Sequence, residues 1–293
     1  MVNDSSYLKF IEQALELAKD IPKYFSKYSN KIFCNKQKII LLVLKQKLRT
    51  TYRGLIEILK TTEALVSAID LKRIPHHSTL VKFAKKLKAN LLNLLLPYRK
   101  AKVVAVDATG FELESKSYYY RRLQNSDKKQ KTKRFMKLSI TADIDKQLIL
   151  AHKIRKNNKR CNIEFRDMLR DLNIRYVIAD KGYDSKQNRQ FVIKNNAIPI
   201  IPVKRHSNFY GYLRSRKKIN GNIYHQRSKI ETIFSCIKRK YGSCLKARTC
   251  ESQKKELICK LIAYNVDRLI TLYKIILLGF QQSPFAIELY YYI

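Results

Sequence analysis

The chain has 293 residues, with 61 Lys and Arg against 23 Asp and Glu, which gives a formal net charge of +38 at pH 7. Hydrophobic residues make up 45% of it, which excludes a disordered basic tail and leaves enough apolar side chains for a folded core. Because such a charge excess repels itself, we expect a polyanionic partner. Nucleic acid is favoured over a membrane surface, since phosphate neutralisation supplies most non-specific affinity.

Insertion into a membrane and a cysteine-based metal site are both disfavoured. Residues 1–20 contain acids and predict an amphipathic helix, not a signal peptide. The most apolar run, residues 269–280, is too short to span a bilayer and contains Lys274. The six cysteines form no C-x-x-C pair and have no histidine at zinc spacing. They indicate reduced thiols, and we expect a cytoplasmic, nucleoid-associated protein.

Residues 1–97 are predicted to be helical throughout. Three segments keep an apolar face, at 35–48, 50–69 and 76–96, the first with Asn35 as its N-terminal cap and the last starting at Ser78. Short helices followed by one rich in lysine suit a helix-turn-helix arrangement. A helical bundle with a solvated basic face explains the same pattern about as well.

The pattern changes after Pro97 to an alternation of strands and helices. Short β-branched or apolar runs predict strands, and segments with apolar residues at helical spacing predict helices. The helix at 185–196 would be capped by Ser185. The order is mixed α/β. The expected strands are 102–110, 118–122, 135–145, 147–156, 174–184 and 198–204, and the expected helices are 162–173, 185–196, 224–240 and 250–277.

Three acids stand out in this acid-poor chain. Asp107 ends the strand VVAVDATG, and Asp180 ends the strand in YVIADKGYD. Ligands of open α/β sheets gather at the carboxyl ends of strands, so the two converge if their strands are neighbours. Glu231 would join them from a helix. Three carboxylates in one site repel each other unless a cation neutralises them, and such oxygen ligands suit Mg²⁺ or Mn²⁺.

Glu231 also lies on an unusual polar stripe. If residues 224–240 form one α-helix, then Tyr224, Arg227, Glu231 and Lys238 fall within an arc of about 60°. Each acid has a structural alternative: Asp107 pairing with an arginine, Asp180 serving as a turn residue, and Glu231 forming an ion pair with Arg227 or Lys238.

The motifs together resemble a known family. The stripe spells Y-x2-R-x3-E-x6-K, and with VVAVDATG and YVIADKGYDS it is similar to the DDE transposases of bacterial and archaeal insertion sequences, in the branch that carries this signature. Similarity extends to KKELICKLIAYNVDRL near the end and, more weakly, to YRGLIEIL and IPHHSTLVKFAKKL in the N-terminal part, so the resemblance covers most of residues 50–270.

The resemblance implies a fold and an activity. The fold is α/β, a ribonuclease-H-like mixed sheet flanked by helices and preceded by an all-helical N-terminal domain. The domains are expected at 1–97 (DNA binding), 98–272 (catalytic) and 273–293 (C-terminal tail). The activity is metal-dependent strand cleavage at the ends of a mobile element, followed by joining of the freed 3′-hydroxyl to target DNA.

Site residues also follow from the resemblance. Asp107, Asp180 and Glu231 would be the catalytic triad and hold two divalent cations, Mg²⁺ or Mn²⁺. Arg227 and Lys238 would hold DNA phosphates near the cut, and Tyr224 would contact DNA or orient Glu231. Two further candidates for DNA contact, Lys181 and Tyr183, flank the turn after Asp180. The partners would be double-stranded DNA, with terminal inverted repeats and target, and a second copy of the chain in a homodimer on DNA.

Other interpretations remain open at this point. The chain could be a catalytically silent, sequence-specific DNA-binding protein derived from a transposase, a nuclease that cuts without joining, or a structural RNA-binding protein. The basic segment 118–134 could track DNA with its tyrosines or form a solvated hairpin tip. The aromatic tail 285–293 could be a docked strand or a dimer contact.

Overall fold

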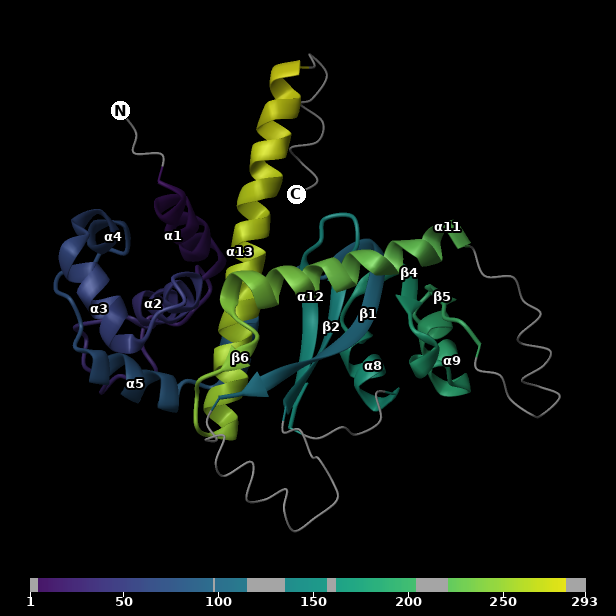
Figure 1. Cartoon of the computed structure of the whole chain (residues 1–293), viewed down its shortest axis with the longest axis horizontal. Coiled ribbons are helices and arrows are strands. Elements are labelled where there is room, and N and C mark those ends of the chain that lie inside the picture. Colours follow the sequence, from purple (N-terminus) through teal and green to yellow (C-terminus); the bar gives the residue numbers. More distant parts are fainter. Residues whose placement is uncertain (1–4, 97, 115–134, 157–161, 204–220, 283–293) are drawn as a thin grey trace, which may run out of the picture. The chain divides into compact units, whose positions relative to one another are not determined.

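The computed structural model describes residues 5–96, 98–114, 135–156, 162–203 and 221–282 (Figure 1). The chain divides into two units, one made of residues 1–87 with 262–293 and the other of residues 88–261. The long helix α13 (Cys250–Gln282) contributes to both units, because the division falls inside it. The predicted segments 118–134 and 285–293 lie outside the described residues. No described helix is long and apolar enough to cross a membrane.

The first unit is helical, as predicted. Its helices are α1 (Ser6–Leu17), α2 (Asn35–Lys47), α3 (Tyr52–Thr61), α4 (Glu63–Ala68) and α5 (His77–Lys86), together with the C-terminal part of α13. Lys47 of α2 connects α13 and α1 within this unit. The Lys47 ammonium forms a partly buried ion pair with Asp267, at 2.6 Å and 2.8 Å from its two carboxylate oxygens, and it lies 5.2 Å from the centre of the Phe10 ring.

The helix boundaries in this unit differ from the sequence prediction. The cap of α2 is Cys34 and not Asn35: the Cys34 sulfur accepts the Gln37 N–H, and the Gln37 side chain accepts the Cys34 N–H. Asn35 is buried and donates to the Pro22 carbonyl. The predicted helix 50–69 is two helices, because Thr62 has a non-helical backbone (φ −129°, ψ 84°).

The third predicted helix is also shorter than expected. α5 starts at His77, with His76 as its cap, and ends before Leu87, whose ψ of 127° is extended. The short helices α6 (Ala89–Leu92) and η1 (Asn93–Leu95) follow it and belong to the second unit. The helix-turn-helix arrangement stays a prediction.

The second unit contains a mixed sheet. The strands are β1 (Lys100–Leu113), β2 (Phe135–Asp143), β3 (Ile149–Arg155), β4 (Asn173–Ala179), β5 (Ile198–Ile200) and β6 (Cys244–Leu245). Among the described residues the order is β3-β2-β1-β4-β5, with β6 paired to the end of β1. β1, β2 and β3 are antiparallel neighbours, whereas β4, β5 and β6 run parallel to their partners. This order, flanked by helices, confirms the predicted ribonuclease-H-like α/β fold.

Helices cover the two faces of this sheet (Figure 1). α8 (Asn162–Leu169) and α9 (Lys186–Lys194) pack on one face, where Phe165 and Val192 join Val104 and Val106 of β1 in a buried cluster. α12 (Ser228–Tyr241) crosses the opposite face, and it follows α11 (Gly221–Tyr224) and the turn η3 (His225–Arg227). Since side chains alternate along a strand, residues 107 and 109 of β1 face α12.

Candidate active site

Two of the three predicted acids lie next to each other at one edge of the sheet. β1 and β4 are parallel neighbours, and the last pair in their register is Val106 with Ala179. Asp180 directly follows the carboxyl end of β4, and Asp107, the residue after Val106, lies beside it within β1, which continues to Leu113. Both acids therefore stand where the pairing of the two parallel strands ends, the place where ligands of such sheets gather. The condition that the sequence left open, that these strands are neighbours, is met.

Helix α12 brings the third acid to the same place. Its buried residues Ile230, Ile233, Phe234 and Ile237 anchor the helix on the sheet, while Glu231 points away from this apolar side and is exposed. The Arg227 guanidinium joins the elements: it lies 3.3 Å from an Asp107 carboxylate oxygen and 2.9 Å from a Glu231 oxygen. One arginine therefore connects a strand acid to a helix acid 124 positions later in the chain (231 − 107).

The pKa of Asp107 is set by burial and by the charges around it. Its side chain is 22% exposed. Loss of hydration raises the pKa of Asp107, as do the negative charges of Asp180 and Glu231, while the Ala108 N–H and Arg227 lower it, with a net pKa above the ordinary value. Asp180 and Glu231 are thus each close enough to Asp107 to disfavour its negative charge. An additional positive charge among them would be stabilising.

Lys238 also faces the sheet beside these acids. Its ammonium donates to the Thr109 hydroxyl at 2.7 Å and lies 5.5 Å from the centre of the Phe111 ring. Thr109 is two residues after Asp107 and so on the same face of β1. Lys238 is therefore held near the acids by a neutral hydroxyl, and its positive charge stays available to an anion. Thr109 was not among the predicted site residues, although strand alternation from Asp107 would have found it.

The remaining candidates differ in how accessible they are. Lys181 is exposed in the turn η2 (Lys181–Tyr183), directly after Asp180. Tyr183 is 3% exposed and packs against Phe165, with ring centres 5.5 Å apart, so its ring belongs to the core. Tyr224 is half-buried at the end of α11. The stripe geometry assumed one continuous helix, whereas a 3₁₀ turn separates Tyr224 from α12, so its angular position relative to Glu231 is not the expected one.

The structural alternatives for the three acids are all present. Asp107 and Glu231 both pair with Arg227, and Asp180 accepts the N–H of Lys181 at 2.7 Å as the cap of η2. In the part of the chain that the structure describes, no group of three His, Cys, Asp or Glu side chains is close enough to hold a metal ion. The donor set nonetheless fits Mg²⁺ or Mn²⁺ chemically, because it offers carboxylate oxygens that repel one another and are now neutralised by an arginine.

Comparison with known proteins identifies the family. A family model described as a transposase DDE domain matches residues 98–266, more than half of the chain. The chain belongs to this family of DDE transposases. The family model does not distinguish branches within the family. Membership in the branch found in bacterial and archaeal insertion sequences therefore stays a prediction.

Two further comparisons complete this description. The DDE transposase is similar to a solved structure, the piggyBac transposase in a synaptic complex with hairpin DNA, at a TM-score of 0.48 and 10% sequence identity, covering 92% of this chain and 73% of that one. No curated protein matches the chain.

Proposed function

We propose that this DDE transposase cuts DNA at the ends of a mobile element and joins the freed 3′-hydroxyl to a target strand, using divalent metal ions. The observation that carries the proposal is the pairing of Asp107 and Glu231 with one guanidinium, with Asp180 beside Asp107 at the end of the neighbouring strand. A purely structural role would be served by neutral side chains, whereas this chain keeps mutually repelling acids on a face lined with cations.

The three acids would be the catalytic residues and would hold two Mg²⁺ or Mn²⁺ ions. When bound, such ions lower the pKa of an attacking water or hydroxyl and stabilise the leaving oxygen of a phosphodiester. Both oxygens of Asp107 are engaged, one by the Ala108 N–H and one by Arg227, so the carboxylate is held in a fixed orientation. Ion binding would require Arg227 to leave Asp107 and Glu231.

The cations of the site would then act on the DNA. Arg227, freed from the two carboxylates, has the planar fork that binds a phosphate at two points. Lys238, held on Thr109, would serve as a point charge for a second phosphate, and Lys181 would add an exposed charge next to Asp180. Tyr224 would contact DNA from α11. The burial of Tyr183 favours a packing role, and we assign it no contact with DNA.

The partners follow from this activity. We expect double-stranded DNA carrying the terminal inverted repeats, a target duplex, and a second copy of the chain, because two ends must be held together during joining. Such a protein would act in the cytoplasm, at the nucleoid.

Joining is the step that separates this proposal from a simple nuclease. The test is to incubate the chain with a short duplex bearing its own element end and a circular target DNA, with Mg²⁺ or Mn²⁺. The proposal predicts covalently joined end–target products that disappear with EDTA. Cut ends without joined products would identify a nuclease, and DNA binding without cutting would identify a catalytically silent DNA-binding protein.

A further inference from the structure

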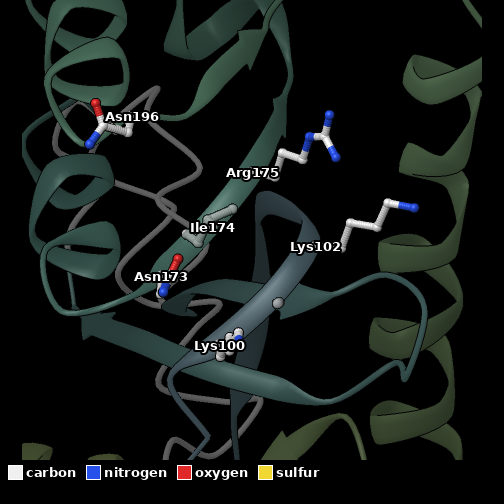
Figure 2. Close-up of a pocket in the computed structure, with 7 residues that line it drawn as sticks. Lys100, Lys102, Asn173, Ile174, Arg175 and Asn196 are labelled. Carbon is white, nitrogen blue, oxygen red and sulfur yellow. The ribbon is translucent and has the colours of Figure 1, made fainter. Parts of the chain in front are cut away.

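A basic groove lies at the end of the catalytic sheet away from the acids. It has a volume of about 330 Å³ and is formed where β1 and β4 begin (Figure 2). Lys100 and Lys102 come from β1, Asn173 and Arg175 from β4, and Asn196 from the turn before β5. All five side chains are exposed. The polar lining contains three cations and two amides and no carboxylate.

The strand register places the cations side by side. Lys100 pairs with Asn173, and the pairs on either side of Lys102 put it next to Arg175. Figure 2 shows these two long side chains extending in the same direction. Like charges on neighbouring strands destabilise a sheet unless another group neutralises them. Among the described residues, no ion pair with an acid is found for Lys100, Lys102 or Arg175.

The neighbouring Arg99, unlike the cations of the groove, is bound by backbone carbonyls. Its guanidinium donates to the backbone carbonyls of Leu96 at 2.8 Å and Leu150 at 3.2 Å, and its own carbonyl accepts the Asn173 N–H at 2.7 Å. These bonds fix the starts of both strands. The groove is therefore built on a rigid backbone, so a ligand would bind it without ordering the chain first.

The position of the groove separates it from the candidate active site. Lys102 is five residues before Asp107 on β1, which corresponds to roughly 17 Å along a strand. A phosphate in the groove would thus belong to a stretch of DNA other than the one at the acids.

We propose that this groove binds the phosphate backbone of duplex DNA outside the segment that is cut. The inference rests on the proposed function for the class of ligand. Three cations provide the charge, and the side-chain amides of Asn173 and Asn196 can donate to phosphate or sugar oxygens. A ligand of this kind neutralises Lys102 and Arg175 together, which no described side chain does.

The test compares two triple variants that lose the same charge. The groove variant is Lys100→Gln, Lys102→Gln and Arg175→Gln; the control variant is Arg170→Gln, Lys186→Gln and Lys194→Gln, whose cations are exposed on α9 or just after α8. Binding of a labelled DNA duplex is measured by fluorescence anisotropy at several salt concentrations. Each lost phosphate contact lowers the slope of log affinity against log salt by about 0.9, so the groove variant should lose about 2 to 3 slope units.

The outcomes separate the groove from the proposed function. The control variant should keep a slope within about one unit of the wild type. Equal losses in both variants, or none in the groove variant, overturn the inference, and so does a groove variant that loses only the binding of an RNA duplex. If the wild-type chain itself shows no salt-dependent DNA binding, the proposed function fails first. Thermal melting checks that both variants fold, which we expect because the substituted side chains are exposed.

Discussion

Lys260 on α13 is a buried cation whose removal should strongly destabilise the second unit. It is 2% exposed, and its ammonium donates to the carbonyls of Gly242 at 2.9 Å and Cys244 at 2.8 Å. A carboxylate oxygen of Glu256, one turn earlier on α13, lies 4.0 Å from the Lys260 ammonium. The same carboxylate accepts hydrogen bonds from the N–H groups of Lys246 and Ala247. This network holds the segment that leads from α12, with Glu231, to β6 on the edge of β1.

The substitution Lys260→Met keeps the length of the side chain and removes its charge. Two hydrogen bonds to a charged donor contribute about 1.5–3 kcal/mol each, and breaking a buried pair by removing one partner costs about 3–5 kcal/mol. We therefore expect a loss of about 3–5 kcal/mol in the free energy of unfolding of this unit. At roughly 2–4 °C per kcal/mol for a unit of this size, the melting temperature should fall by about 10 °C.

The assay is thermal and urea unfolding followed by far-ultraviolet circular dichroism, since the chain contains no tryptophan. The matched control is Lys254→Met on the same helix, where the lysine forms an ion pair at 2.6 Å with Glu251, a side chain 64% exposed. Exposed pairs at this spacing contribute less than about 0.5 kcal/mol. If Lys260→Met destabilises the protein no more than Lys254→Met does, our account of the Lys260 network is wrong.

Three further predictions concern the acids and a helix cap. Asp107→Asn should stabilise the metal-free protein at neutral pH, because burial raises the pKa of Asp107 and the folded state thus disfavours its charge. Because the folded-state pKa is raised, protonation of Asp107 at low pH favours folding, and this stability is lost as pH rises through the folded pKa. The gain in melting temperature from Asp107→Asn should therefore shrink as the pH is lowered. A gain that grows toward low pH would contradict the raised pKa. Arg227→Gln should bind Mn²⁺ several-fold more tightly in calorimetry, because the guanidinium competes for Asp107 and Glu231, and should bind duplex DNA more weakly; weaker Mn²⁺ binding would refute this competition. Ser185→Ala should lower the free energy of unfolding by about 1 kcal/mol in urea titrations, because Ser185 caps α9 by accepting the Asn188 N–H, and an unchanged midpoint would argue against the cap.

The sequence predicted the parts of the fold that depend on local patterns. The strand that contains Asp107, the strand that leads to Asp180 and the Ser185 cap are all present, because β-branched runs and capping residues act within a few positions. The full length of β1, to Leu113, was not predictable locally: its end pairs with β6, more than 130 residues later in the chain.

Helix ends and side-chain partners were harder to predict. The break at Thr62 has no proline or glycine to mark it; Thr61 instead bonds back to the carbonyls of Glu57 and Ile58, which competes with continuing the helix. The 3₁₀ turn before α12 likewise has no sequence signal.

For the candidate site, the sequence indicated the acids and the arginine but not how they would pair. Helix spacing offered Glu231 an ion pair with Arg227, and that pair is formed. The simultaneous contact of Arg227 with Asp107 depends on α12 packing on β1, which is a tertiary effect. Lys260 was missed because a lysine within an apolar helix is normally exposed, and its backbone partners are visible only in the folded chain.

The most direct test of the central claim is the substitution Glu231→Gln, which removes one carboxylate charge and nearly keeps its shape. Cleavage of a labelled duplex carrying the element end is measured for both proteins with Mg²⁺ or Mn²⁺ and with EDTA, alongside DNA binding. We predict cutting at the end by the wild type only with metal, and loss of cutting by Glu231→Gln while binding survives. Metal-dependent cutting that Glu231→Gln retains at the wild-type rate would contradict the assignment of the three acids.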